Sequence, residues 1–274
     1  MYDVCYDYYI MFVWGYTNVH DCKNLFISPG LLDMRVSLGE PGSEHKENIK
    51  SGSKAALAGG VTTMVCLPNT NPVIDNVSVA EYVQKRAKEE SKINLYTYGS
   101  ITKNFDGQNL SEMGLLTKAG VKGFTDATQS VDNSAVFKTA LEYSKAFDAL
   151  IIQFPEDRNL AKHGVMNEGE ISTRLGLPGI PTLAEVIVIE RDLRLVELTG
   201  AKYHVSCIST ADAVDVIRKA KQKGLKITCD TSPQYFTLNE LAIDDYRTFA
   251  KLSPPLRSEK DRVAVANGLK DGTI

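Results

Sequence analysis

The chain alternates short apolar runs with longer amphipathic stretches. The apolar runs are rich in β-branched residues, as buried strands are, and the amphipathic stretches repeat apolar residues at helical spacing. This alternation predicts a parallel α/β fold. The expected strands are 25–27 continuing to 36, 62–67, 93–101, 121–125, 150–154, 203–208 and 227–231. The expected helices include 77–88, 134–147, 183–198, 211–223 and 258–269.

Two glycines mark where helices should end. Gly120 and Gly224 each follow a helical pattern and precede the next apolar run. Glycine adopts the left-handed conformation that closes many helices, so both positions are expected to have a positive φ. With these boundaries the chain contains seven strand–helix units.

The composition restricts the classes of protein to which this chain could belong. The chain has 274 residues, of which 43% are hydrophobic and 24% charged, values typical of a globular chain. A net charge of -3, dispersed along the sequence, provides no basic field, so we expect no nucleic-acid partner. No stretch reaches the ~20 apolar residues of a membrane span, so we expect no membrane partner.

The cysteines and the N-terminal residues indicate the cellular compartment of the protein. The five cysteines are an odd number, and Cys66, Cys207 and Cys229 lie in apolar runs, which favours buried thiols in a reducing compartment. Asp3 and Asp7 stand where a signal peptide would be positively charged. We therefore expect a cytoplasmic protein.

The first 24 residues form a separate region. Aromatic side chains crowd into it, at Tyr2, Tyr6, Tyr8, Tyr9, Phe12, Trp14 and Tyr16. We favour a remnant of a small N-terminal β region, with an edge strand or strand pair, for residues 1–24. An aromatic contact surface for a partner is the alternative.

Residues 28–42 are the most informative segment. They read Ser-Pro-Gly-Leu-Leu-Asp-Met-Arg-Val-Ser-Leu-Gly-Glu-Pro-Gly, which resembles the first barrel strand of the dihydroorotases, Asp-x-His-x-His-x-Arg-Glu-Pro-Gly. In that family the two histidines hold zinc and the arginine binds a substrate carboxylate. Here Arg35, Ser37 and Gly39 occupy these positions. A guanidinium has no lone pair to offer a metal and stays charged.

Other motifs of the same family follow in the same order. They are 58–76, 164–170, 174–181, 204–211 and 253–259. The resemblance implies an amidohydrolase (β/α)₈ TIM-like barrel over residues 25–274, of which this chain supplies seven units and stops before strand eight, whose end bears the family's general-base aspartate. Either the sequence is a fragment, or something else covers the open edge.

The remaining metal positions of the family also differ here. Phe154 and Cys207 stand where zinc histidines are expected, and Ala127 replaces one member of an acidic pair, leaving Asp126. Asp126 could hold a residual metal, but a single carboxylate without imidazoles is a weak site, so we favour a loop acceptor. Cys207 could bind zinc as a thiolate, but a packed core residue is favoured. We expect no metal or other cofactor, although active members of the family use zinc.

Few functional candidates remain after these losses. Asn69 matches a family asparagine that helps to bind the substrate carboxylate, although a turn role is sufficient to explain it. Ser253 replaces a second family asparagine. His45, His163 and His204 fall in different strand–loop units, so each is expected to be a surface or structural residue.

Two functional hypotheses remain open. The resemblance is to the non-catalytic dihydroorotase-like proteins of pyrimidine biosynthesis, which accompany aspartate carbamoyltransferase as structural subunits in an oligomeric assembly. This pseudoenzyme hypothesis is favoured by the missing ligands. The alternative is a working cyclic amidohydrolase, a dihydroorotase or a hydantoinase-like or allantoinase-like relative, with an atypical site around Asp126 and Cys207.

Overall fold

The computed structural model describes residues 10–13, 16–19 and 22–274. The first elements are β1 (Ile10–Val13) and β2 (Tyr16–Val19), which pair antiparallel, with Ile10 opposite Val19. A strand pair was one of the expectations for the N-terminal region. The aromatic residues Tyr2, Tyr6, Tyr8, Tyr9 and Trp14 lie outside the described residues. The division at residue 24 stays a prediction.

Six parallel strands and one bridging segment form the sheet. β3, β4 and β5 pair in that order, and β6, β9 and β10 pair in the order β6-β9-β10. Phe124 joins the two groups, because it bridges Gly99 after β5 on one side and Ile151 of β6 on the other. The strands are β3 (Leu31–Val36), β4 (Val61–Cys66), β5 (Asn94–Thr97), β6 (Ile151–Gln153), β9 (Tyr203–Val205) and β10 (Ile227–Cys229).

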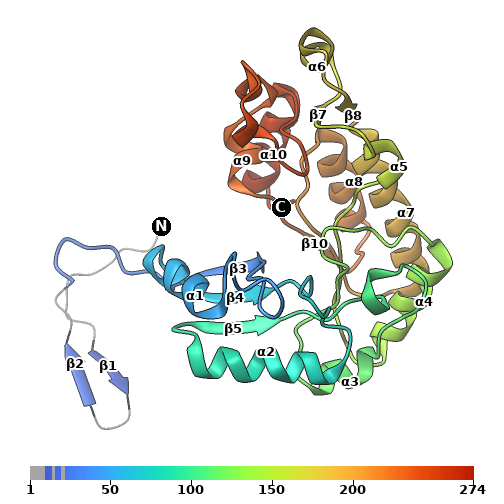
Figure 1. The fold of residues 1–274 in the computed structure, drawn as a ribbon. Coiled ribbons are helices and arrows are strands. Elements are labelled where there is room, and N and C mark those ends of the chain that lie inside the picture. The colour runs from blue at the N-terminus through green and yellow to red at the C-terminus, as the bar shows by residue number, and fades with distance from the viewer. Residues whose placement is uncertain (1–9, 14–15, 20–21) are drawn as a thin grey trace.

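The sheet is open within the described residues. β3 pairs with β4 and β10 pairs with β9, and no pairing joins β3 to β10. Figure 1 shows the chain following an arc, with β3 and α1 on one arm and α9 and α10 on the other. The parallel α/β class predicted from the sequence is confirmed, and strands lie at six of the seven predicted positions, whereas the position at 121–125 contributes only the bridges of Phe124.

Helices follow the strands and cover the outer side of the sheet. Several begin at a side-chain cap, such as Asn76, whose Oδ1 accepts a hydrogen bond from Val79 N, and Thr210, whose Oγ1 accepts one from Ala213 N. The main helices are α1 (Ile49–Ala58), α2 (Val77–Glu90), α3 (Met113–Lys118), α4 (Ser134–Lys145), α7 (Leu183–Thr199), α8 (Ala211–Gln222) and α10 (Glu259–Lys270). None of the helices in the described ranges is long and apolar enough to cross a membrane.

Shorter elements lie in the connections that follow the strands. The loop after β6 contains α5 (Arg158–Ala161), β7 (Met166–Asn167), α6 (Glu170–Leu175) and β8 (Gly179–Ile180). The connection after β10 contains α9 (Pro233–Thr237), η2 (Glu240–Ile243) and η3 (Thr248–Ala250), and η1 (Lys103–Phe105) follows β5. These connections extend from the carboxyl ends of the strands, where sites of parallel α/β folds are built.

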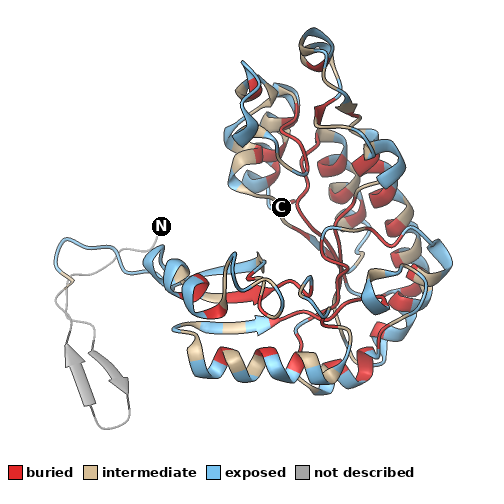
Figure 2. Ribbon diagram, viewed as in Figure 1, coloured by how far each residue is buried: buried red, intermediate tan, exposed pale blue. Residues whose placement is uncertain are grey.

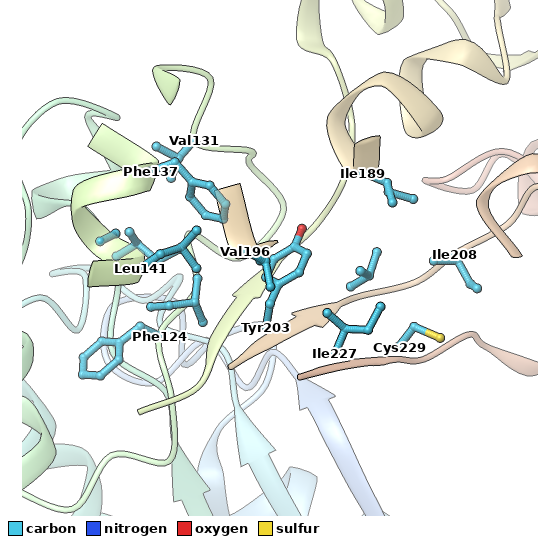
Figure 3. Packing of buried hydrophobic residues seen from close by; sticks show 14 of the residues in the cluster. Phe124, Val131, Phe137, Leu141, Ile189, Val196, Tyr203, Ile208, Ile227 and Cys229 are labelled. Atoms are coloured by element: carbon cyan, nitrogen blue, oxygen red, sulfur yellow. The ribbon is translucent and has the colours of Figure 1, made fainter. Parts of the chain in front are cut away.

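The main hydrophobic core lies between the strands and the helices. Phe137 of α4 and Tyr203 of β9 meet edge to face, with ring centroids 6.0 Å apart, and the surrounding aliphatic side chains fill the layer (Figure 3). A smaller cluster, which includes Val65, Tyr98 and Ile152, comes from β4, β6 and the residue after β5. Figure 2 shows the burial concentrated along the inner strands and the strand-facing sides of the helices.

The sequence set some element boundaries too widely. Residues 25–27 lie outside β3 and are exposed, and the predicted strand at 93–101 contains only Asn94–Thr97. The predicted strand at 121–125 is reduced to the bridge at Phe124. The five predicted helices are confirmed to within a few residues. Gly120 (φ +94°) and Gly224 (φ +80°) have the positive φ expected of them.

Candidate functional site

Arg35 lies at the centre of the site at the carboxyl ends of the strands. Its Nη1 donates to Ser206 Oγ at 3.1 Å, and its Nη2 donates to the carbonyl oxygen of Ala127 at 3.2 Å. The guanidinium carbon lies 5.3 Å from the centre of the Phe154 ring, a distance at which the ring face attracts a cation. The side chain therefore connects β3 with the ends of three other strand segments.

Two of the four residues at family histidine positions, Phe154 and Cys207, are buried. Cys207 has a φ of +58°, a strained conformation for a residue with a side chain. Burial raises the pKa of its thiol, and the charge of Asp230 adds to this, although the Arg35 cation opposes it. The thiol therefore stays protonated near neutral pH, and a protonated thiol is a poor metal ligand.

Asp230 belongs to the site, and sequence reasoning missed it. It follows β10 directly and accepts hydrogen bonds from the backbone N–H of Cys207 and from the side chain of Ser206. His204 Nε2 lies 2.9 Å from its Oδ2, while His204 Nδ1 lies 2.8 Å from Thr228 Oγ1. Burial favours the neutral carboxyl, but the interactions with His204, the backbone N–H of Cys207 and the Arg35 cation together outweigh it, so the pKa of Asp230 is lowered. A carboxylate immediately after an apolar strand run was the available signal.

Asp126 is fully engaged by the loop that follows β5. Its Oδ1 accepts hydrogen bonds from the backbone N–H groups of Ile101 and Thr102 at 2.8 and 3.0 Å, and its Oδ2 accepts one from the Thr102 hydroxyl. Burial raises the pKa of this carboxyl to about 6, against the lowering effect of these hydrogen bonds. Asp126 therefore has the loop-acceptor role that we favoured from the sequence.

Asn69 and Ser37 bind each other at the rim. Asn69 Nδ2 donates to Ser37 Oγ at 3.0 Å, and both residues are exposed. Gly39, at the position of the family's arginine, has a φ of +68°. The candidate substrate contact at Asn69 is thus occupied by a short polar partner within the chain. Ser253 is exposed.

The donor set does not fit a zinc ion. Zinc sites use several thiolate, imidazole or carboxylate ligands converging on one point, whereas these positions carry a guanidinium, a phenyl ring, a hydroxyl and a protonated thiol. His45 and His163 are exposed, and His204 is bound to Asp230. Across residues 22–274 and the two described N-terminal strands, no group of three His, Cys, Asp or Glu residues could hold a metal.

A second polar centre lies deeper, beneath the loops. Arg257 is only 4% exposed; its Nη1 donates to Asn167 Oδ1 at 3.1 Å and to the carbonyl oxygen of Ile180 at 2.9 Å, and its Nε donates to Ser209 Oγ at 3.1 Å. Its Nη2 lies 3.9 Å from Glu185 Oε2. Glu185 in turn accepts hydrogen bonds from Ser209 and from the backbone N–H of residue 210. This cluster ties together the segments 164–170, 204–211 and 253–259.

The first-strand and second-strand motifs are also joined structurally. Glu40 is buried, its Oε2 accepts a hydrogen bond from Ile49 N at 2.9 Å, and its Oε1 accepts one from Arg86 Nε at 2.8 Å. A Cβ on Gly42 (φ +100°) would lie 2.3 Å from the carbonyl oxygen of Asn71, so the two loops can approach this closely only with glycine here. These family-like residues hold the backbone in place.

Comparison with known proteins shows which family this chain is similar to. A family model described as "Dihydro-orotase-like" matches residues 24–213. Dihydroorotase from Syntrophus aciditrophicus is 48% identical over 258 residues, which cover 94% of this chain and 61% of that protein. Dihydroorotase from Anaplasma phagocytophilum is 48% identical over 259 residues, covering 94% and 58% respectively. The chain thus spans about three-fifths of the length of these relatives.

Solved structures agree on the fold. L-hydantoinase from Arthrobacter aurescens superposes with a TM-score of 0.78 at 20% identity, over 97% of this chain and 63% of that chain. D-hydantoinase from a Thermus species superposes with a TM-score of 0.70 at 22% identity, over 90% of this chain and 56% of that chain. At these identities the likeness concerns the fold alone. The family match, in contrast, covers most of the sequence, and the chain belongs to the dihydroorotase-like family.

Proposed function

We propose that this chain is a dihydroorotase-family protein of pyrimidine biosynthesis that has lost catalysis and acts as a structural partner of aspartate carbamoyltransferase. The observation that carries the proposal is the position of Arg35. Its guanidinium fills the space among Ser206, Ala127 and Phe154, where family members bring metal ligands together. A fixed cation with no lone pair repels a metal ion and cannot coordinate one.

The chemistry of the reaction supports the same proposal. Opening an unactivated cyclic amide at neutral pH calls for a strong nucleophile, which metal-bound hydroxide supplies in hydrolases of this kind. The neutral thiol of Cys207 is not such a nucleophile. Both ring nitrogens of His204 are engaged, by Thr228 and Asp230, so that imidazole is not available as a base toward Cys207.

The test is metal analysis combined with an activity assay. Purified protein should contain far less than one zinc per chain by elemental analysis. It should not interconvert carbamoyl aspartate and dihydroorotate, with or without added zinc. Stoichiometric zinc together with zinc-dependent turnover would contradict the proposal and favour the alternative of an atypical active amidohydrolase.

The partner is the second part of the proposal. The family-like motifs at Glu40, Gly42 and Arg257 support the folded shape while the ligand positions have changed, which is what a structural role requires. We place the contact on the outside of the barrel or in the N-terminal region, away from Arg35, in an oligomeric assembly of the cytoplasm. The free thiols of Cys22, Cys66, Cys207 and Cys229 are compatible with a reducing compartment.

Co-elution tests the partner directly. A stable interface buries more than ~1,000 Å², so the two proteins should elute together in size-exclusion chromatography at micromolar concentration. The transferase should also become more resistant to heat in the mixture, because binding to the folded state stabilises it. Separate elution with unchanged transferase stability would remove the structural role while leaving the metal result untouched.

A further inference from the structure

Helix α7 carries an exposed line of residues along its outer side. The helix packs between α4 and α8 (Figure 1), and its inner side contributes Ile189, Leu193 and Val196 to the main core. Five exposed residues follow one another at intervals of three or four positions, which places them on one face of the helix. They are Leu183, Ile187, Glu190, Arg194 and Leu198, and we call them the α7 stripe.

The ends of the α7 stripe are apolar. Leu183, Ile187 and Leu198 are 52%, 42% and 67% exposed. The neighbouring helix differs, because the fully exposed residues of α8 are all polar: Asp212, Asp215, Lys219 and Gln222. Exposed apolar residues that are scattered singly are ordinary, but several on one helix face form a patch of the kind that binds another protein.

A short neighbouring helix adds to this patch. α5 begins beside the start of α7, because Asp157 N donates a hydrogen bond to the carbonyl oxygen of Ala184 at 2.8 Å. On α5, Leu160 is 42% exposed. The apolar surface at the start of α7 therefore continues onto a second element.

The middle of the α7 stripe is charged. Glu190 makes no side-chain hydrogen bond or ion pair within the part of the chain that the structure describes. Arg194 Nη1 lies 3.8 Å from Glu197 Oε2, and both side chains are exposed, so this pair contributes little in water. Glu190 and Arg194 can therefore form ion pairs with a partner at little cost.

The spacing of the stripe is symmetric about the point between residues 190 and 191. Leu183 and Leu198 are equally far from this point along the chain, and so are Ile187 and Arg194. A two-fold axis placed there pairs two α7 helices antiparallel, with Leu183 of one copy against Leu198 of the other. The methylene groups of Arg194 then cover Ile187 of the other copy.

The charges complement each other in the same arrangement. Arg194 of one copy lies within ~4.5 Å, along the helix axis, of Glu190 of the other copy, at ~1.5 Å per residue. The two-fold axis repeats this contact, so two ion pairs form across the interface. A parallel pair of α7 helices would instead place Glu190 against Glu190 and Arg194 against Arg194, and like charges repel.

A surface that is complementary to itself in one orientation fits a second copy of the same chain. We infer that two copies of this protein associate through the α7 stripe, with the two α7 helices antiparallel. The inference depends neither on the loss of catalysis nor on the transferase, and the interface lies on the outer side of the barrel, away from Arg35.

The size of the contact sets the expected affinity. A helix of 17 residues is ~25 Å long. Two such helices with Leu160 on each side form an interface at the lower end of the range for stable complexes, which is about 1,200 Å² in total. We therefore expect a dimer with a dissociation constant of about 10 μM.

Analytical ultracentrifugation of the full chain, over concentrations on both sides of that constant, tests the inference. Ile187→Lys should raise the dissociation constant about tenfold or more, because it removes an apolar contact and places a cation beside Arg194 of the other copy. The control Leu115→Lys changes a leucine of α3 that is 50% exposed, and it should dimerise like the unchanged chain. Circular dichroism checks that both variants are folded.

A charge exchange tests the antiparallel orientation. Glu190→Arg and Arg194→Glu should each raise the dissociation constant about fivefold or more, because each replaces two attractions by two repulsions. The double variant, with both substitutions, should dimerise nearly as well as the unchanged chain. Lys219→Glu on α8 changes the net charge as much as Arg194→Glu does and should have no effect on dimerisation.

Three outcomes would overturn the inference. A folded chain that stays monomeric at ~10-fold above the expected dissociation constant would leave the α7 stripe to a different protein. A dimer that Ile187→Lys does not weaken would show that another surface joins the copies. A double variant that dimerises no better than Glu190→Arg or Arg194→Glu would exclude the antiparallel pairing of the two charges.

Discussion

The two arginine centres of this protein differ in depth and in partners. Arg257 is buried and its hydrogen bonds reach three separate loop segments, including the carbonyl oxygen of Ile180 and the side chain of Asn167. Arg35 is half-buried at the mouth and donates two hydrogen bonds, to Ser206 and Ala127. Arg257 belongs to a segment that resembles the family, whereas Arg35 stands where the family has a metal ligand.

The difference separates a residue that holds loop segments together from a residue that lies at the mouth of the candidate site. A buried cation with fixed partners is costly to disturb, because each partner would lose its hydrogen bond away from water. A cation at the mouth can exchange its partners for water. Residues at the mouth can therefore differ without loss of the fold, provided that the deeper centre stays intact.

Replacing Arg257, the more deeply buried of the two arginines, should have the largest effect on the free energy of unfolding. Arg257→Met leaves Glu185 buried beside an uncharged neighbour and leaves Asn167 and Ser209 without their donor, so the free energy of unfolding should fall by about 3–5 kcal/mol. Urea denaturation measures this change. The control Arg218→Met removes an arginine whose ion pairs with Asp215 and Asp271 are exposed, and should cost less than about 1 kcal/mol. Similar losses in the two variants would contradict the comparison.

An intermediate effect is expected from the buried carboxyl of Asp126, and it depends on pH. Its folded pKa of about 6 lies above the ordinary value of 3.8, so the folded state holds this proton more tightly than the unfolded state. The resulting stabilisation is fully present below the ordinary pKa and is lost as the pH rises through about 6.

The variant Asp126→Asn isolates this contribution. The stability of the unchanged chain relative to the variant should fall by up to about 3 kcal/mol as the pH rises from ~4 to ~7, at 1.36 kcal/mol for each unit of pKa. Thermal and urea unfolding over this range measure it. The buried Asp192, whose pKa burial also raises to about 6, is present in both proteins, so its effect cancels. A constant difference across the range would show that Asp126 is not titrating as described.

The smallest effect on stability should come from replacing Arg35, which lies at the mouth of the candidate site. Arg35→Leu removes the hydrogen bonds to Ser206 and Ala127 and the contact with the Phe154 ring, and its cost should be about 1 kcal/mol, because the Ser206 hydroxyl keeps Asp230 as a partner. Neither protein should gain stoichiometric zinc. A loss as large as that of Arg257→Met would show that the mouth, too, is essential to the fold.

Sequence patterns were sufficient for the elements whose determinants are local. The helices from Val77 and Ala211 follow from apolar spacing and from the caps Asn76 and Thr210, and Gly120 and Gly224 follow from the conformation that glycine permits. That Arg35 and Phe154 offer no ligand to zinc also follows from residue types, because a guanidinium or a phenyl ring cannot coordinate zinc in any fold.

Contacts between distant segments required the tertiary structure. Nothing local to Asp230 indicates that it meets His204 and Cys207, and nothing local to Arg257 indicates Asn167, which lies 90 positions earlier. Of the strand predicted at 121–125, only Phe124 forms bridges, to Gly99 and Ile151. Strand pairing depends on residues that are far away in the sequence, so local spacing does not determine it. The sequence alone determined which residue types occupy the candidate site and where the strand–helix units lie, since side-chain type and local spacing decide these. Tertiary packing decided which polar groups are buried together and which strand edge stays uncovered, since burial depends on residues far apart in the chain.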